Sequence, residues 1–346
     1  MSLARVNVLN IGLMLGSLAV AMVVPFESFL LAYAVLGPLH YLTQISWLHD
    51  RGYFTRGNRD WLLLALLAAG IVGAMLLGSI GTGHRWMGHV AVSLMVFAFG
   101  YSLLLATTKD KALRWAGALV IGSLAVALYG TRGTAVLFGL YVPTIIHVCV
   151  FTAMFVLYGA LKGRSVSAHL SALVFAGCVG AAVLWDPGTL GYTASQYAIE
   201  AYRDFGALHL QLMRDTGRLA EAVPATTTDS PIYPLAGYAE LFTLPGGLQI
   251  GRLIAFAYTY HYLNWFSKTS VIRWHEVPRA RMVAVVVIWI VSVALYAWEF
   301  SVGMKWLLFL SFLHVLLEFP LDFRTAFGVG GELLGRIGIR SRAAAG

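Results

Sequence analysis

The chain has 346 residues, of which 59% are hydrophobic and only 12% are charged, and its mean hydropathy is +0.76. A soluble globular protein of this length could not bury so much apolar surface, so the composition excludes that class and indicates a polytopic membrane protein. The formal net charge of +8 does not point to nucleic acid, because basic residues normally flank membrane spans on the cytoplasmic side. The two cysteines, Cys149 and Cys178, lie in apolar runs and indicate no disulfide framework.

Ten apolar segments are long enough to span a bilayer, and each is expected to be helical because lipid satisfies no backbone polar group. The first is interpreted as a retained span, since no small-residue cleavage site follows it. The predicted fold is an all-α polytopic bundle of about ten transmembrane helices in a single membrane domain over residues 1–346. In chain order, the predicted spans cover residues 7–25, 28–48, 61–80, 87–107, 115–130, 134–160, 168–185, 248–266, 282–300 and 304–320.

Basic residues in the connecting loops alternate along the chain. The loop with Arg51, Arg56 and Arg59 is basic, whereas the next loop has only Arg85. The alternation continues into a basic tail, predicted to be cytoplasmic over residues 321–346. The positive-inside rule therefore places both termini in the cytoplasm, and the predicted location is the cell inner membrane with a multi-pass topology.

Residues 186–247 interrupt the series of spans. Within them, residues 195–223 place apolar positions near helical spacing and predict an amphipathic helix. The topology makes the whole stretch an extracytoplasmic insertion within the membrane domain. It is predicted to be either a lid over the bundle or a surface helix that joins two spans.

Four histidines lie inside predicted spans, which is costly and uncommon. They are His40, His147, His261 and His314, and their four spans all run from outside to inside in the predicted topology. Each lies in the inner half of its helix. At a rise of 1.5 Å per residue, the four imidazoles are expected to share one layer in the cytoplasmic leaflet.

Polar residues one turn from these histidines favour a metal site. Gln44, Asn264 and Glu318 follow His40, His261 and His314 by four, three and four residues, so that each pair shares a helix face. A metal-bound imidazole needs a partner for its other nitrogen, and an intramembrane carboxylate needs a cation. Glu318 is the predicted catalytic carboxylate, as a ligand or beside one. The predicted metal ligands are His40, His147, His261 and His314, with His49 and His275 completing a second metal site or orienting the first.

Imidazole with carboxylate suits iron, copper or zinc, and iron with open coordination positions activates dioxygen. The expected function is therefore a non-haem iron oxygenase, with one or two ions, whose lipophilic substrate enters from the bilayer. Trp47 and Trp274, near the site, fit an interfacial aromatic belt equally well. The predicted substrate-binding residues are Tyr41, Gln44, Tyr260, Asn264 and Trp265.

Two other functions use the same polar cluster. A transporter would use the histidines and Glu318 as a proton relay, and an electron carrier would hold haem between two opposed histidines. A retinal pigment is disfavoured, because the lysines flank the spans. Hydrogen bonding to a neighbouring helix is the commoner role of a single intramembrane histidine.

Four patches of the chain resemble the Brp/Blh family of membrane β-carotene 15,15′-dioxygenases. The resemblance implies an all-helical membrane enzyme in which His40, His147, His261 and His314 hold iron, and dioxygen splits β-carotene into retinal. The first patch departs from the family pattern, because Leu39 separates the proline from the histidine, and another isoprenoid or lipid fits the resemblance as well as carotene does. The patches are GPLHYLTQ, VPTIIHVCVF, FAYTYHYLNWFS and LSFLHVLLEFPLDF.

Overall fold

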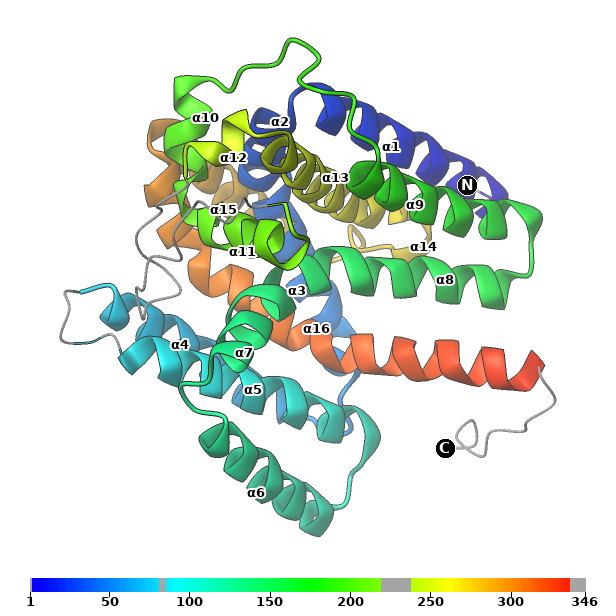
Figure 1. The fold of residues 1–346 in the computed structure, drawn as a ribbon. Helices are drawn as coiled ribbons and strands as arrows, with labels where there is room; N and C mark the ends of the chain where they lie inside the picture. The colour runs from blue at the N-terminus through cyan, green and yellow to red at the C-terminus, as the bar shows by residue number, and fades with distance from the viewer. Residues whose placement is uncertain (1, 81–83, 85, 219–237, 337–346) are drawn as a thin grey trace.

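A computed structural model describes the chain except for residues 1, 81–83, 85, 219–237 and 337–346. Every regular element in this described part is a helix (Figure 1), which confirms the all-α class. Among the described residues, seven helices are long and apolar enough to cross a membrane. They cover Leu3–Val23, Asp60–Gly78, Trp86–Thr107, Arg132–Gly163, Val166–Leu184, Arg279–Trp298 and Phe300–Arg336.

All ten predicted spans coincide with helical segments, but three of them do not meet the criteria of length and hydropathy. These are residues 28–48, 115–130 and 248–266. The last predicted span continues without a break to Arg336, so the predicted tail from residue 321 begins as helix; residues 337–346 lie outside the described part.

The helices are α1 (Leu3–Val23), α2 (Pro25–Leu31), η1 (Ala32–Leu36), α3 (Gly37–Asp50), η2 (Gly52–Phe54), α4 (Asp60–Gly78), α5 (Trp86–Thr107), α6 (Lys111–Ala127), α7 (Arg132–Thr134), η4 (Ala135–Phe151), α8 (Thr152–Gly163), α9 (Val166–Leu184), α10 (Gln196–Ala201), η5 (Tyr202–Phe205), α11 (Gly206–Asp215), α12 (Glu240–Thr243), α13 (Pro245–Ser267), α14 (Thr269–Ile272), α15 (Arg279–Trp298) and α16 (Phe300–Arg336).

Two π-helical segments lie next to histidines that are predicted to bind metal. The segment η1 ends two residues before Pro38, and η4 contains Pro143. Proline lacks an N–H group and its ring clashes with a carbonyl of the preceding turn, which favours a widened hydrogen-bond pattern. His40 follows the first segment by one turn and His147 lies within the second, so both histidines lie where the regular α-helical periodicity is interrupted.

Two hydrophobic cores meet near the middle of the bundle. One core joins α1, α2, α13 and the insertion, and the other joins α4, α5 and α16. In Figure 1, α16 passes between the α4–α5 pair and the layer of α1, α9 and α13. Tyr41 and Val148 belong to the first core, whereas Val315 belongs to the second. His147 and His314 are neighbours of these residues in the chain and lie at the junction of the two cores.

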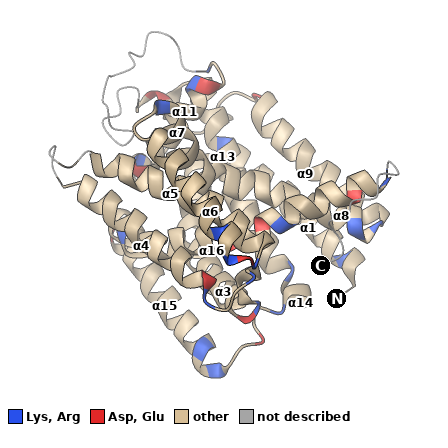
Figure 2. Ribbon diagram, turned by 90° about the horizontal axis from the view of Figure 1, so that it is seen from below, with Lys and Arg blue, Asp and Glu red and all other residues tan. Residues whose placement is uncertain are grey.

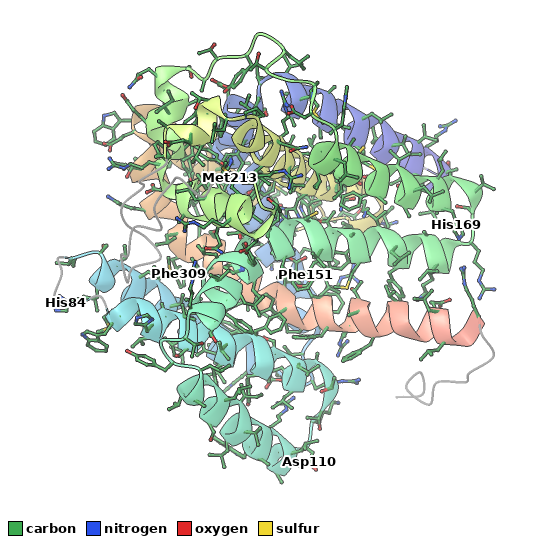
Figure 3. All side chains as sticks on the ribbon, in the orientation of Figure 1. His84, Asp110, Phe151, His169, Met213 and Phe309 are labelled. Atoms are coloured by element: carbon green, nitrogen blue, oxygen red, sulfur yellow. The ribbon has the colours of Figure 1, made fainter. Side chains whose placement is uncertain are left out.

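Charged residues lie mainly at helix ends and in loops (Figure 2), as expected for helices that cross an apolar medium. The start of α1 and the end of α16 lie at the same end of the molecule in Figure 1. In Figure 3, His84 and His169 lie at opposite ends and Phe151 lies near the middle. His84, between α4 and α5, and His169, near the start of α9, are therefore on opposite sides of the bundle, as the predicted alternation requires.

The insertion folds back over one end of α13. Arg252 of α13 is fully buried and its guanidinium donates to the carbonyls of Met22 and Gly188, at 3.2 and 2.6 Å. The predicted amphipathic helix is divided into α10 and α11 by the 3₁₀ segment η5, and its part from residue 219 onward lies outside the described residues. The described part is thus a covering layer that is tied to the bundle by buried polar contacts.

His209 of α11 fastens this layer to α13. Its ring is fully buried, and its Nε2 lies 2.9 Å from the carbonyl of Gly247, which can only accept a hydrogen bond. Nε2 therefore carries the proton, and Nδ1 accepts from the hydroxyl of Tyr202 at 3.0 Å. Burial lowers the pKa of His209 to about 3.

Acidification is expected to weaken this attachment. The unfolded imidazole binds a proton near pH 6.5, whereas the folded state keeps His209 neutral, so the contribution of this group is complete above about pH 6.5 and falls by about 1.4 kcal/mol per pH unit below it. Thermal unfolding at about pH 7 and about pH 5 should show this loss in the natural protein. The variant His209→Gln keeps a donor and an acceptor and should lose less stability over this range; an equal loss in both proteins would contradict the prediction.

Candidate metal centre

The four histidines predicted to bind metal come together at the junction of the two cores. They project from α3, η4, α13 and α16 and are between 1% and 7% exposed. Four successive ring contacts close a circle of imidazoles. The ring centroids are separated by 4.7 Å for His40 and His261, 5.0 Å for His261 and His147, 5.2 Å for His147 and His314, and 5.5 Å for His314 and His40.

One pair in this circle already has the spacing of two ligands of one ion. The Nε2 atoms of His40 and His261 are 3.1 Å apart. Two nitrogens bound to one metal at about 2.1 Å, with an angle between 90° and 110°, are about 3.0–3.4 Å apart. The same distance allows one hydrogen bond between the two neutral rings, so metal binding would replace a weak contact.

The other two rings are buried without partners for their Nε2 atoms. Among the described residues, neither Nε2 of His147 nor Nε2 of His314 makes a hydrogen bond. A buried polar group left unpaired costs about 1–3 kcal/mol. A metal ion inside the circle would give both nitrogens a partner.

A carboxylate stripe on α16 continues from the circle. The Oε2 atom of Glu318 lies 3.7 Å from Nε2 of His147, and Gln44 contacts the same carboxyl group. One turn further, Asp322 is 2% exposed, and neither of its carboxylate oxygens has a hydrogen-bond partner in the described part of the chain. Sequence reasoning missed Asp322, although the spacing of His314, Glu318 and Asp322 by four residues each indicates a shared helix face.

The donor types suit a first-row transition metal better than calcium or magnesium, because imidazole dominates the set. As placed, however, no group of three or more His, Cys, Asp or Glu side chains among the described residues has the geometry to hold a metal ion. The His40–His261 pair has the required spacing, whereas His147 and His314 would have to turn about their side-chain torsions. The donor types thus suit a metal centre, whereas the described side chains as they lie do not form one.

Thr152 orients one member of the circle. Its hydroxyl oxygen lies 2.8 Å from Nδ1 of His261, and its side chain is buried. When Nδ1–H donates to this hydroxyl, Nε2 of His261 is left with a free lone pair that points toward His40. Such contacts to the second nitrogen are usual for metal-binding imidazoles. Nothing in the sequence around Thr152 distinguishes it from other threonines in apolar helices.

The predicted substrate-binding residues separate into two groups. Tyr41 stacks on the His314 ring at 4.2 Å and lines a cavity, whereas Gln44 contacts Glu318 instead. Tyr260, Asn264 and Trp265 do not line that cavity. The Tyr260 hydroxyl is within hydrogen-bond distance of Asn10 on α1 and of Asn264 on its own helix, and Trp265 donates to Thr43 on α3. Tyr260 and Trp265 therefore hold α13 against α1 and α3.

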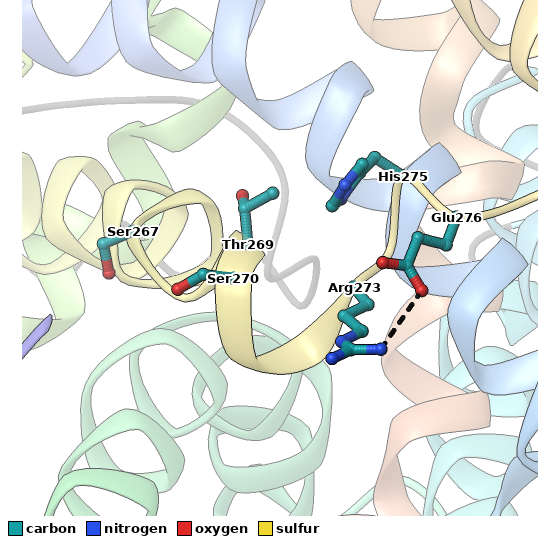
Figure 4. Close-up of a pocket in the computed structure, with 6 residues that line it drawn as sticks. All are labelled: Ser267, Thr269, Ser270, Arg273, His275 and Glu276. Carbon is teal, nitrogen blue, oxygen red and sulfur yellow. Dashed lines mark ion pairs between the residues drawn. The ribbon is translucent and has the colours of Figure 1, made fainter. Parts of the chain in front are cut away.

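The structure does not bring His49 and His275 into the circle. Nδ1 of His49 lies 3.2 Å from the hydroxyl of Tyr53, at the end of α3. His275 lines a polar surface pocket in which Arg273 pairs with Glu276 at 3.6 Å (Figure 4). Within the described residues, neither ring contacts the four central histidines or the other, so a second metal site is not assembled here.

A cavity of about 570 Å³ opens beside the circle and is lined in part by His147, His261 and His314. Side chains of α4, α5, η4 and α16 make most of its wall, and the insertion contributes residues 203–205, 207 and 208. This volume lies within the range of about 300–1,000 Å³ that is typical of small-molecule sites. The arrangement can hold an apolar molecule with one part next to three of the four imidazoles.

Comparisons of this chain with protein-family models, with curated proteins and with solved structures find no match. Function must therefore be inferred from the chemistry of the histidine circle and its cavity. The resemblance to the Brp/Blh family stays a prediction from the four sequence patches.

Proposed function

We propose that this chain is a membrane-embedded, non-haem iron oxygenase that acts with dioxygen on a lipophilic substrate. The observation that carries the proposal is the circle of four buried imidazoles, with Glu318 beside it and a largely apolar cavity next to it. A carotenoid, another isoprenoid or a lipid is the expected substrate class. Nothing in this arrangement calls for a nucleic-acid partner.

Each part of the site has a role in this proposal. His40, His147, His261 and His314 hold the metal, Thr152 fixes the tautomer of His261, and the nearby carboxylates balance the charge. When bound, iron supplies the activation of dioxygen at a coordination position that the protein leaves open. The cavity excludes water and positions the substrate beside the imidazoles. Copper and zinc use the same donors, so the identity of the metal is part of the test.

The spacing of the rings favours a non-haem site over haem. A haem macrocycle would have to lie between two opposed imidazoles, but adjacent rings at 4.7–5.5 Å occupy the space around each pair. A transporter that uses Glu318 and Asp322 as a polar relay is the second candidate, because both carboxyl groups are buried. Transport requires neither iron nor dioxygen.

The membrane topology belongs to the same proposal. Ten spans, rather than the seven that meet the length and hydropathy criteria, would place both termini in the cytoplasm of a cell with an inner membrane. The insertion would then lie outside the cytoplasm and cover the outer end of the cavity. The imidazole circle would lie near the middle of the membrane or in its inner half.

Elemental analysis of the purified protein, together with its visible spectrum, tests the proposal first. We expect about one or two irons per chain and no Soret band. A Soret band would indicate the haem electron carrier, and a chain with no stoichiometric metal would redirect the work to transport assays. Protein that contains iron should then be supplied with β-carotene and other isoprenoids while oxygen consumption is measured.

A further inference from the structure

The cavity changes character with distance from the histidines. Most of its wall is apolar, but Arg203 and Asp204 of η5 and Lys305 of α16 also line it. All three side chains are exposed, which identifies this end as the mouth. In the part of the chain that the structure describes, none of the three belongs to an ion pair within 4.0 Å.

The mouth and the histidine circle are far enough apart for an extended ligand to reach both. Lys305 and His314 lie on the same helix, nine residues apart, which corresponds to about 13–14 Å along the axis. The mouth carries two cations and one anion, a net charge of +1. A guanidinium and an ammonium group that form no ion pair with the described residues suit a carboxylate or a phosphate, and the guanidinium can bind either with two parallel hydrogen bonds.

We propose that the ligand of this cavity is an amphiphile, with an apolar chain beside the histidines and an anionic head, a carboxylate or a phosphate ester, between Arg203 and Lys305. This inference rests on the proposed function in taking the ligand to be the substrate. A pure hydrocarbon would leave its end against three charged groups and would gain nothing from them. The insertion supplies Arg203, so it also selects the substrate head.

Cations at a membrane surface commonly attract lipid headgroups without any cavity. The two explanations differ in what they predict for ligands that have the same hydrocarbon chain and different head groups. If Arg203 and Lys305 only contact bulk lipid, binding inside the cavity will not depend on the charge of the head. If they bind the head, removal of the charge will weaken binding at unchanged chain length.

Binding of octadecanoate, octadecyl phosphate and octadecanol to the purified full chain distinguishes these cases. We expect at least one of the two anions to bind about tenfold more tightly than the alcohol, equivalent to about 1.4 kcal/mol. Preference between the anions identifies the head as carboxylate or phosphate ester. The double variant Arg203→Gln/Lys305→Met should bind all three alike. The control Lys162→Met/Arg164→Gln removes the same charges from the end of α8 and the residue after it, and should keep the preference.

Measuring the iron content of each protein distinguishes failure of the amphiphile proposal from failure of the oxygenase proposal. The double variant at the mouth leaves every histidine of the circle in place, so its iron content should equal that of the natural protein. Equal binding of anions and alcohol by an iron-containing natural protein would overturn the amphiphile inference and leave the oxygenase proposal standing. A preference for anions in a protein that binds no metal would do the reverse.

Discussion

Purified protein with His147→Ala and His314→Ala is expected to contain no stoichiometric iron and to consume no oxygen with a lipophilic substrate. These two residues supply the unpartnered Nε2 atoms of the circle. Loss of a group that merely orients a ligand typically costs about 10–100-fold in metal affinity, so loss of two direct ligands should cost more than about 100-fold. Metal analysis after dialysis against buffer and oxygen uptake are the two measurements.

A matched control removes two other imidazoles. His84 and His169 are exposed and lie at opposite ends of the molecule (Figure 3), so His84→Ala/His169→Ala should keep its iron. Helical content and elution volume should be the same in both double variants, which separates metal loss from misfolding. Iron retained after removal of His147 and His314 would remove the basis for the metal centre. His49→Ala/His275→Ala should also keep its iron, because neither ring contacts the circle.

That the four central histidines lie at one level of the bundle could be predicted from the sequence, but which other side chains face them could not. Lysine and arginine placement set the direction of each predicted span, and helical rise then set the depth of each histidine. The sequence places His49 and His275 at or just beyond the inner ends of two of these spans, which predicts for them a second metal site or an orienting role at the first. The structure separates them from the circle, because the packing of whole helices decides which side chains face the same interior point.

The other differences between prediction and structure arise from the face of the helix on which each side chain lies. Tyr258 and Tyr262 line the cavity with His261, whereas Tyr260 points toward α1. At 3.6 residues per turn, a shift of two positions moves a side chain to nearly the opposite face. The π-helical segments change this periodicity just before His40 and around His147, so a regular helical projection is unreliable there. Thr152 was missed for a related reason, since its partner lies on a different helix.

In the insertion, the amphipathic pattern predicts helix formation, but it does not predict where the helix packs. Apolar spacing predicted helix over residues 195–223, and the described part is helical from Gln196 to Asp215, apart from the 3₁₀ segment η5. Two alternatives, a lid and a surface helix, remained open from the sequence. Phe205 and Leu208 line the cavity while Tyr202 and His209 pack on the bundle. The described part thus forms one wall of the cavity.

That wall provides a second variant with a large expected effect. Ala207 lies on α11 and lines the cavity, and its small side chain leaves space in front of the apolar wall. In Ala207→Trp, the indole would occupy part of a cavity of about 570 Å³. The charged residues of the mouth and the four histidines are not substituted in this variant. Misplacement of a substrate by about 1 Å can cost about 100-fold in rate, so we expect at least that loss of turnover at full iron content.

If loss of turnover results from filling the cavity, the loss should increase with the size of the side chain at position 207. Ala207→Leu should lose less activity than Ala207→Trp, because it fills less of the cavity, and Ala116→Trp should lose none, because Ala116 is exposed on α6, away from the cavity lining. Iron content and oxygen uptake, measured on the same preparations, give two independent readings. Unchanged turnover in Ala207→Trp would mean that the substrate reaches the histidines by another route. Loss of turnover with iron retained would assign the substrate to this cavity, since the metal ligands are the same in every member of the series.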